Sequence, residues 1–215
     1  MEIGILGTGV VGKAIGTKLV QLGHRVKMGS RSATNPKAAE WVKESGANAT
    51  QGTFAEAAAF AKILFNCTSG TGAVDALRLA GETNLTGKIV VDVSNPLDFS
   101  KGMPPPLTIC NTDSLGEQLQ RTFPQARVVK TLNTVNCLVM VNPSLVPGSH
   151  DLFICGNDAS AKAEVTAILK NWFGWKSVID LGDITNARAV EMLLPLWIRL
   201  YGLVKSPNFN FKIVR

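Results

Sequence analysis

Three glycines near the start of the chain have the spacing of a phosphate-binding turn. Gly7, Gly9 and Gly12 read Gly-x-Gly-x-x-Gly, after an apolar stretch at residues 2–6 and before helical spacing from Val10 to Leu22. In such a turn the first glycine permits the tight bend, the second lets a pyrophosphate approach the backbone, and the third lets helix and strand pack closely. The following helix adds free N–H groups and a positive dipole end. The sequence therefore predicts a dinucleotide-binding turn made of Gly7, Thr8, Gly9, Val10, Val11 and Gly12.

A basic loop follows the second predicted strand, and no acidic residue occurs between Glu2 and Glu40. Units that bind NAD usually place Asp or Glu here, on the ribose diol. This chain instead has Ser30, Arg31 and, further on, Lys37, which offer a hydroxyl, a guanidinium fork and an ammonium to a 2′-phosphate. A charge-assisted hydrogen bond contributes about 1.5–3 kcal/mol. We therefore expect NADP(H) to be preferred over NAD(H), the alternative being a solvated basic loop.

Short polar segments follow three further predicted strands. Because the carboxyl ends of parallel strands meet at one edge, ligands bind there in open α/β sheets. Small polar loops are common at strand ends, so one alone decides little, but four in succession favour a binding site. We assign to the cofactor site the residues Cys67, Thr68, Ser69, Ser94, Asn95, Pro96, Asn133, Thr134 and Asn136.

The chain shows no convincing catalytic acid, base or metal site. Neither His24 nor His150 follows the end of a predicted strand, and Tyr201 and Lys205 have Tyr-x-x-x-Lys spacing only in an apolar region near the C-terminus. The cysteines lack the spacing of metal ligands: Cys67, Cys110, Cys137 and Cys155. We therefore assign no catalytic side chain and no metal ligand. Hydride transfer between two cofactors needs neither, because the protein then contributes orientation and water exclusion.

Strand and helix patterns alternate along the chain. They predict an α/β fold, a doubly wound Rossmann sheet of about eight mainly parallel strands with a small C-terminal helical lobe. We expect an NADP-binding domain at 1–150 and a sheet extension with the helical lobe at 151–215. Predicted strands are 2–6, 25–28, 63–66, 89–93, 127–131, 152–155 and 177–181, and predicted helices are 10–22, 54–60, 71–79, 115–123, 159–172 and 185–194. Pro195 should bend or break the last helix.

Composition narrows the class of protein. The 215 residues are 46% hydrophobic and carry a net charge of +6. The basic residues are dispersed without interleaved aromatics, which argues against nucleic acid and favours attraction of a polyanionic cofactor. The apolar tract from Ala189 to Val204 is interrupted by Glu191, Pro195 and Arg199, so we expect no membrane span. The chain enters its first strand at residue 2, and we expect a cytoplasmic protein.

The combined motifs resemble the coenzyme F420:NADP oxidoreductase family, whose members reduce a deazaflavin with NADPH. The matching segments are 7–12, 22–24, 29–31, 89–96, 128–130 with 133–134, 153–158, and 186–188 with Glu191, Pro195 and Leu196. The resemblance implies a Rossmann domain with a small lobe over the cleft, and often a homodimer. It also implies that Thr8, Ser30, Arg31 and Lys37 hold the adenosine 2′-phosphate, while the loop from Asn133 to Asn136 and the lobe shape a second pocket.

The acceptor half departs from the archaeal pattern of that family. Archaeal members carry a proline-containing loop after the fourth strand and a His-Thr-Ile-Pro-like run after the sixth, where this chain has 67–70 and 133–136. The identity of the small-molecule redox acceptor therefore stays open, with F420, FMN and FAD as the choices. Related domains of membrane ferric reductases pass hydride to a flavin. Two alternatives stay open: an NADPH-dependent reductase of a small imine or carbonyl, similar to pyrroline carboxylate reductases, and an NADP(H)-binding sensor without turnover.

Overall fold

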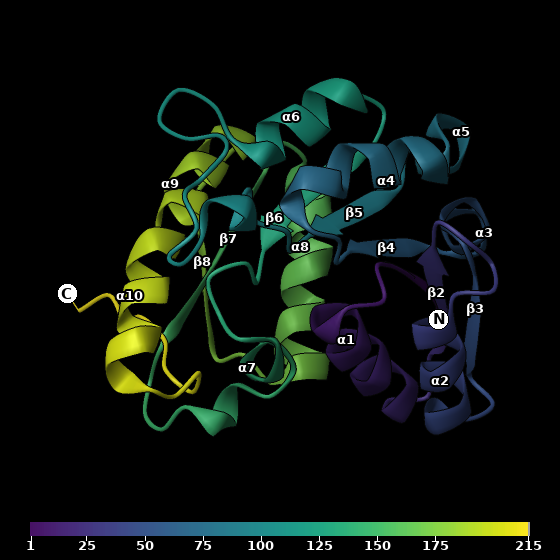
Figure 1. Ribbon diagram of the computed structural model, residues 1–215, viewed down its shortest axis with the longest axis horizontal. Helices are drawn as coiled ribbons and strands as arrows, with labels where there is room; N and C mark the ends of the chain where they lie inside the picture. Colours follow the sequence, from purple (N-terminus) through teal and green to yellow (C-terminus); the bar gives the residue numbers. More distant parts are fainter. Residues whose placement is uncertain (215) are drawn as a thin grey trace.

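The strands form one eight-stranded sheet with the order β3-β2-β1-β4-β5-β6-β7-β8 (Figure 1). The computed structural model describes residues 1–214. The neighbouring pairs are parallel except β6 and β7, which run antiparallel. The strands are β1 (Glu2–Leu6), β2 (Arg25–Ser30), β3 (Ala49–Thr53), β4 (Ile63–Asn66), β5 (Ile89–Asp92), β6 (Arg127–Thr131), β7 (Asp151–Gly156) and β8 (Ser177–Asp180). The predicted Rossmann sheet is confirmed.

Helices cover both faces of the sheet. One face carries α1 (Val10–Gln21), α2 (Pro36–Ser45), α7 (Cys137–Val141), η3 (Pro143–Leu145), α8 (Ala159–Ile168) and the π-helical turn η4 (Leu169–Phe173). The other carries α3 (Phe54–Phe60), η1 (Gly70–Gly72), α4 (Ala73–Ala80), α5 (Glu82–Leu85), α6 (Leu115–Thr122), η5 (Ile184–Asn186) and α9 (Ala187–Met192). The remaining elements are η2 (Phe99–Lys101) and α10 (Leu194–Val204). Each face has its own hydrophobic cluster, so central strands are buried on both sides and read as continuous apolar runs.

Local signals set several element boundaries as predicted. Thr53 and Glu56 form a reciprocal capping box at the start of α3. Asp158 accepts a hydrogen bond from the Ala161 N–H and caps α8. Pro195 lies in the first turn of α10, directly after α9 ends, so the predicted break is confirmed.

Other sequence expectations were wrong. No strand was predicted at β3 and no helix at α2 or α7, and β2 continues to Ser30. Ser114 and Glu117 have the spacing of a capping box, and the Glu117 N–H donates to the Ser114 hydroxyl. The Glu117 carboxylate instead bonds Arg188 and the Ser114 hydroxyl, so the box at α6 is only half formed. The sequence also predicts an apolar stripe of Trp197, Leu200, Leu203 and Val204, but this stripe of α10 does not face the core throughout, because Leu203 is 77% exposed.

The segment after residue 150 continues the same sheet. Strand β7 begins at Asp151, and the Asp151 N–H donates to the carbonyl of Phe211 in the C-terminal tail. Helices α9 and α10 lie at the opposite end of the sheet from β3 (Figure 1). The division at residue 150 stays a prediction.

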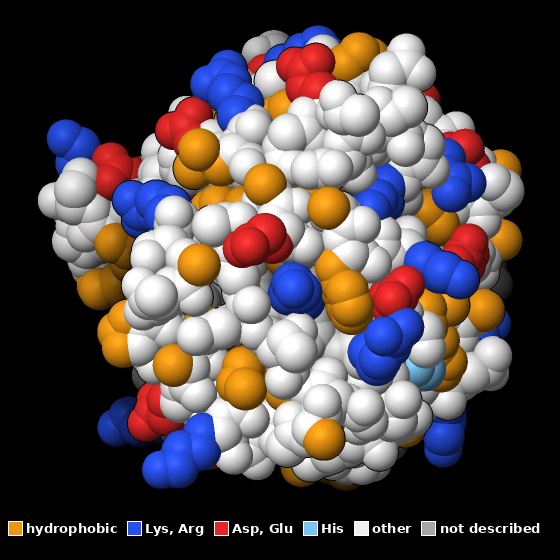
Figure 2. All heavy atoms as spheres, turned by 90° about the vertical axis from the view of Figure 1, so that its right-hand side faces the viewer, with side chains coloured by type: hydrophobic (Ala, Val, Ile, Leu, Met, Phe, Trp, Pro, Cys, Tyr) orange, Lys and Arg blue, Asp and Glu red, His pale blue; other side chains and the backbone are white. Residues whose placement is uncertain are grey.

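Figure 2 shows the β3 side of the molecule, where Lys and Arg side chains are interspersed with Asp and Glu.

None of the helices in residues 1–214 is long and apolar enough to cross a membrane.

Candidate functional site

A pocket of about 610 Å³ lies at the carboxyl ends of β1, β2 and β4. Its volume is within the range of about 300–1,000 Å³ that is usual for small-molecule sites. The loops after these strands bring together eight residues predicted from the sequence: Gly7, Thr8, Gly9, Ser30, Arg31, Cys67, Thr68 and Ser69.

Two glycines of the turn are required by the protein itself. The Gly7 N–H donates to the Gly29 carbonyl at 3.0 Å, and Gly7 has a φ of +111°. A Cβ on Gly7 would lie 2.7 Å from the Cys67 carbonyl oxygen, and a Cβ on Gly12 would lie 2.2 Å from the Gly7 carbonyl oxygen. Side chains at both positions would therefore push apart the strand, the turn and α1.

Gly9 is different, because a Cβ there would meet no protein atom within 4 Å. Its φ of −77° suits any residue. The open space in front of Gly9 and the N-terminus of α1 is where a pyrophosphate needs close backbone approach. The turn therefore fits a dinucleotide.

Some polar groups of the basic loop bond within the loop and fix its shape, and others line the pocket. The Ser30 hydroxyl donates to the Ser32 carbonyl at 2.6 Å and accepts from the Ser32 N–H at 3.2 Å, so it fixes the loop. Arg31 is exposed and lines the pocket. Asn35 caps α2 and also lines the pocket, so the N-terminus of α2 adds a second positive dipole end. Lys37 is exposed on the first turn of α2, outside the lining.

Several lining residues were missed by sequence reasoning. One group lies along a single face of η1 and α4, and Leu79 among them is 55% exposed. Helical spacing signals such a face, but only the sheet order shows that it borders β2 and the basic loop. The missed residues are Asn35, Phe54, Thr71, Gly72, Asp75, Ala76 and Leu79.

The loops after β5 and β6 interlock beside the pocket. The Asn95 amide donates to the Asn133 carbonyl at 2.9 Å, and the Asn133 amide donates to Asn95 Oδ1 at 2.9 Å. A Cβ on Gly70 would lie 2.0 Å from the Asn95 carbonyl oxygen, so the loop after β4 touches this pair. Ser94, Pro96 and Thr134 are buried.

Three predicted site residues lie on or near the first turns of helices. Asn136 caps α7, where it accepts from the Leu138 N–H at 3.0 Å. Val10 is 73% exposed and lines a separate groove between α1 and α7, while Val11 packs against the core.

The pocket offers little acid–base chemistry. Burial raises the pKa of the Cys67 thiol, so this group stays protonated and is a poor nucleophile. Asp75 pairs with Arg78 at 3.1 Å. The His24 ring packs against Trp172 at a tilt of 39°, and Tyr201 stacks on Trp197. In the described part of the chain, no group of His, Cys, Asp or Glu has the geometry of a metal site.

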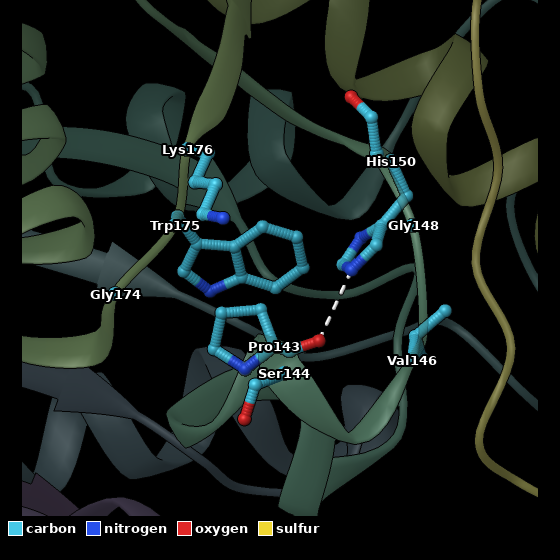
Figure 3. Close-up of a pocket in the computed structure, with 9 residues that line it drawn as sticks. Pro143, Ser144, Val146, Gly148, His150, Gly174, Trp175 and Lys176 are labelled. Atoms are coloured by element: carbon cyan, nitrogen blue, oxygen red, sulfur yellow. Dashed lines mark hydrogen bonds between the residues drawn. The ribbon is translucent and has the colours of Figure 1, made fainter.

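His150 lies in a separate cavity of about 90 Å³ (Figure 3). Its Nε2 is 3.1 Å from the Pro143 carbonyl, its Nδ1 is 2.9 Å from Asn210 Nδ2, and its ring packs edge-on against Trp175. Because neighbours engage both ring nitrogens, we assign His150 a structural role.

The chain is similar to several known proteins. Residues 2–96 match the family model described as "NADP oxidoreductase coenzyme F420-dependent". A crystal structure of a candidate F420-dependent NADP reductase from Arthrobacter sp. FB24 is 52% identical, with full coverage of both chains and a TM-score of 0.95.

Two curated proteins are also similar. The F420-dependent NADP reductase of Methanocaldococcus jannaschii is 32% identical over 130 residues, which are 60% of this chain and 57% of that protein. The metalloreductase STEAP3 of Rattus norvegicus is 32% identical over 202 residues, or 91% of this chain and 38% of that protein. The chain thus spans between 38% and 57% of the length of these curated relatives.

Proposed function

The chain belongs to the family of coenzyme F420-dependent NADP oxidoreductases, and we propose that it transfers hydride between NADP(H) and a flavin or deazaflavin ring. NADPH, when bound, supplies the hydride. The acceptor ring would take up this hydride together with one proton from solvent, at the edge of the ring that faces away from the nicotinamide. The acceptor is F420, FMN or FAD.

One observation carries this proposal: the Gly-x-Gly-x-x-Gly turn, the Arg31 loop and the loop after β4 line a single pocket, and neither this lining nor the adjoining loops at 93–96 and 132–136 contain histidine or tyrosine. A cofactor-to-cofactor hydride transfer is compatible with such a pocket, because neither ring needs a proton donor from the protein. The protein's contribution is to hold the rings in contact and to exclude water. Reduction of an imine or carbonyl, in contrast, requires a donor close to the substrate.

Each part of the pocket has a proposed binding role. Gly9 and the N-terminus of α1 hold the pyrophosphate, and Arg31 with the N-terminus of α2 holds the 2′-phosphate. Leu79 and Phe54 offer apolar surface to the adenine. The interlocked loops with Asn95 and Asn133 lie at the nicotinamide end, beyond the carboxyl ends of β5 and β6.

Incubation of the protein with NADPH and one acceptor at a time tests the proposal. We expect absorbance changes that show oxidation of NADPH with F420, FMN or FAD, and far slower oxidation with NADH. Turnover of a cyclic imine in place of all three acceptors would instead support an imine reductase. Tight NADPH binding without any turnover would support a sensor, and either result would contradict the proposal.

A further inference from the structure

Three ionisable side chains form a fully buried cluster away from the pocket lining. Asp92 ends β5, Lys130 lies beside it on β6, and Glu191 belongs to α9; their side chains are 0%, 0% and 1% exposed. The Lys130 ammonium contacts Asp92 Oδ2 at 2.7 Å, Glu191 Oε1 at 2.8 Å and the Ser94 carbonyl at 2.6 Å. Each ammonium proton therefore has an acceptor, as a buried charge requires.

The carboxylates extend this cluster to other elements. Asp92 Oδ1 accepts from Asn66 Nδ2 at 2.8 Å and from the Ser94 hydroxyl at 2.6 Å. Glu191 accepts from the Leu115 and Gly116 N–H groups at the start of α6, at 2.8 and 3.0 Å. Burial would lower the pKa of Lys130, but the attraction of Asp92 and Glu191 outweighs it and raises this pKa, so the Lys130 ammonium stays protonated.

A second link joins the same helix to the same loops. The Asn133 amide that bonds Asn95 also donates to the Val190 carbonyl of α9 at 3.0 Å. The residue before it, Leu132, is fully buried and has a φ of +63°, an unfavourable conformation for leucine. Such strain persists only where surrounding contacts hold it, and it often marks functional sites.

We propose that Lys130 and Glu191 are positioning residues that hold the loops at 93–96 and 132–136 against helix α9. Through Ser94, the cluster fixes the loop after β5, and Asn95 and Asn133 pass that constraint to the strained loop after β6. The importance for hydride transfer rests on the proposed function, in which these loops border the nicotinamide and its acceptor. The cluster reaches the pocket lining through Asn66, which bonds Asp92 and Thr68, whereas the hydrogen bonds of the Ser30 hydroxyl and the Asn35 cap stay within the basic loop and α2. The affinity for the adenosine end should therefore change little.

The structure offers a matched control. Glu117 on α6 is also buried and pairs with Arg188 of α9, with contacts of 2.5 and 2.8 Å. This ion pair joins the same two helices as Glu191 but contacts neither loop. Glu117→Gln therefore weakens the lobe without removing the proposed positioning contact.

Amide hydrogen exchange of the free protein tests the contact between the cluster and the two loops, and it needs no hydride acceptor. In Glu191→Gln we expect the amides at 93–95 and 132–136 to exchange about 10–100-fold faster, the cost of losing bonds to a charged group. Amides at 7–12 should be unchanged, and the NADPH dissociation constant should stay within about twofold. In Glu117→Gln both loops should exchange as in the wild type.

Single-turnover kinetics then measure the consequence for the reaction. With the acceptor that the wild type uses, Glu191→Gln should slow hydride transfer about 10–100-fold at saturating NADPH, because reacting rings tolerate little misplacement. Glu117→Gln should remain close to the wild type. If Glu191→Gln does not fold, Glu191→Asp is the replacement, because it shortens the side chain away from Lys130 while leaving the total charge of the cluster unchanged.

Unchanged loop exchange in the folded variant would overturn the inference, as would an equal increase in Glu117→Gln or at residues 7–12. If the wild type reduces no acceptor, the proposed function fails, while the exchange and NADPH-binding measurements still decide whether the positioning link exists.

Discussion

At the scale of residues, the basic loop separates side chains that shape the site from those free to bind. Ser30 is 5% exposed and its hydroxyl is used within the loop, whereas Arg31 is exposed at the pocket. Lys37 contributes only a nearby charge from outside the lining. The preference for a 2′-phosphate should therefore depend mainly on the Arg31 guanidinium and the N-terminus of α2.

Arg31→Ala should raise the NADPH dissociation constant by about 10–100-fold, because charge-assisted hydrogen bonds to the 2′-phosphate are lost. NADH lacks this phosphate, so its affinity should hardly change. Lys37→Ala is the control, and it should weaken NADPH binding by no more than about threefold, as an exposed charge at a distance does. Titration calorimetry with both nucleotides measures these changes, and equal losses for NADPH and NADH would show that Arg31 is structural.

At the scale of elements, the β1–α1 turn contains glycines with different physical roles. Gly12 lies inside α1 and is needed because its neighbour, the Gly7 carbonyl, leaves no room for a Cβ. Gly9 begins the helix and meets no neighbour. One glycine therefore serves folding, and the other serves the ligand.

Gly9→Ala should leave the thermal midpoint of unfolding nearly unchanged, because the small loss at the helix N-cap and the gain from a stiffer unfolded chain offset each other. The same substitution should weaken NADPH binding by at least about tenfold, since the new methyl group occupies the space for the pyrophosphate.

Gly12→Ala should instead lower stability by about 1–3 kcal/mol, the usual cost of overpacking. Thermal denaturation and NADPH titration of both variants separate the two effects. Similar losses of stability in the two variants would contradict this division of roles.

At the scale of the whole molecule, charged side chains affect two properties: the attraction of an anionic cofactor and the stability of the fold in acid. The net charge of +6 favours a polyanionic ligand, while both signs are mixed on the face seen in Figure 2. Several carboxyl groups have pKa values below their ordinary range because hydrogen bonds stabilise the ionised form, as at Asp113, Glu117 and Asp158. The homodimer and the cytoplasmic location stay predictions, and light scattering tests the former.

Acid should unfold the protein through these carboxyl groups. Hydrogen bonds from Arg121 lower the pKa of Asp113 to about 2, below its value of about 3.9 in an unfolded chain. The folded state therefore binds this proton less tightly, and the stability that Asp113 contributes is full above about pH 4 and lost as the pH falls towards 2.

Melting curves across this pH range test the prediction. Asp113→Asn should melt below the wild type at neutral pH, and the gap should close as the pH approaches about 2. A gap that stays constant with pH would show that Asp113 contributes through packing alone.

The sequence by itself determined the features that depend on neighbouring residues. The glycine turn, the caps at Thr53 and Asp158 and the break at Pro195 are set by local backbone chemistry, and all match the structure. The alternation of apolar strands and helices likewise predicted the Rossmann sheet. At β3, α2 and α7 the sequence pattern was too short or too polar for recognition, and tertiary packing stabilises these elements.

Only the tertiary structure decided which polar groups meet. Lys130 carries no local sign of its burial, because its partners Asp92 and Glu191 come from a neighbouring strand and a distant helix. Residues assigned to the cofactor, such as Asn95 and Asn133, bond each other in the structure. Burial of a charge is tolerated only where the fold brings its partners within hydrogen-bonding distance. The sequence therefore predicts the half of the cleft that we propose binds the phosphates, while the arrangement of the half proposed to hold the nicotinamide depends on the assembled sheet and lobe.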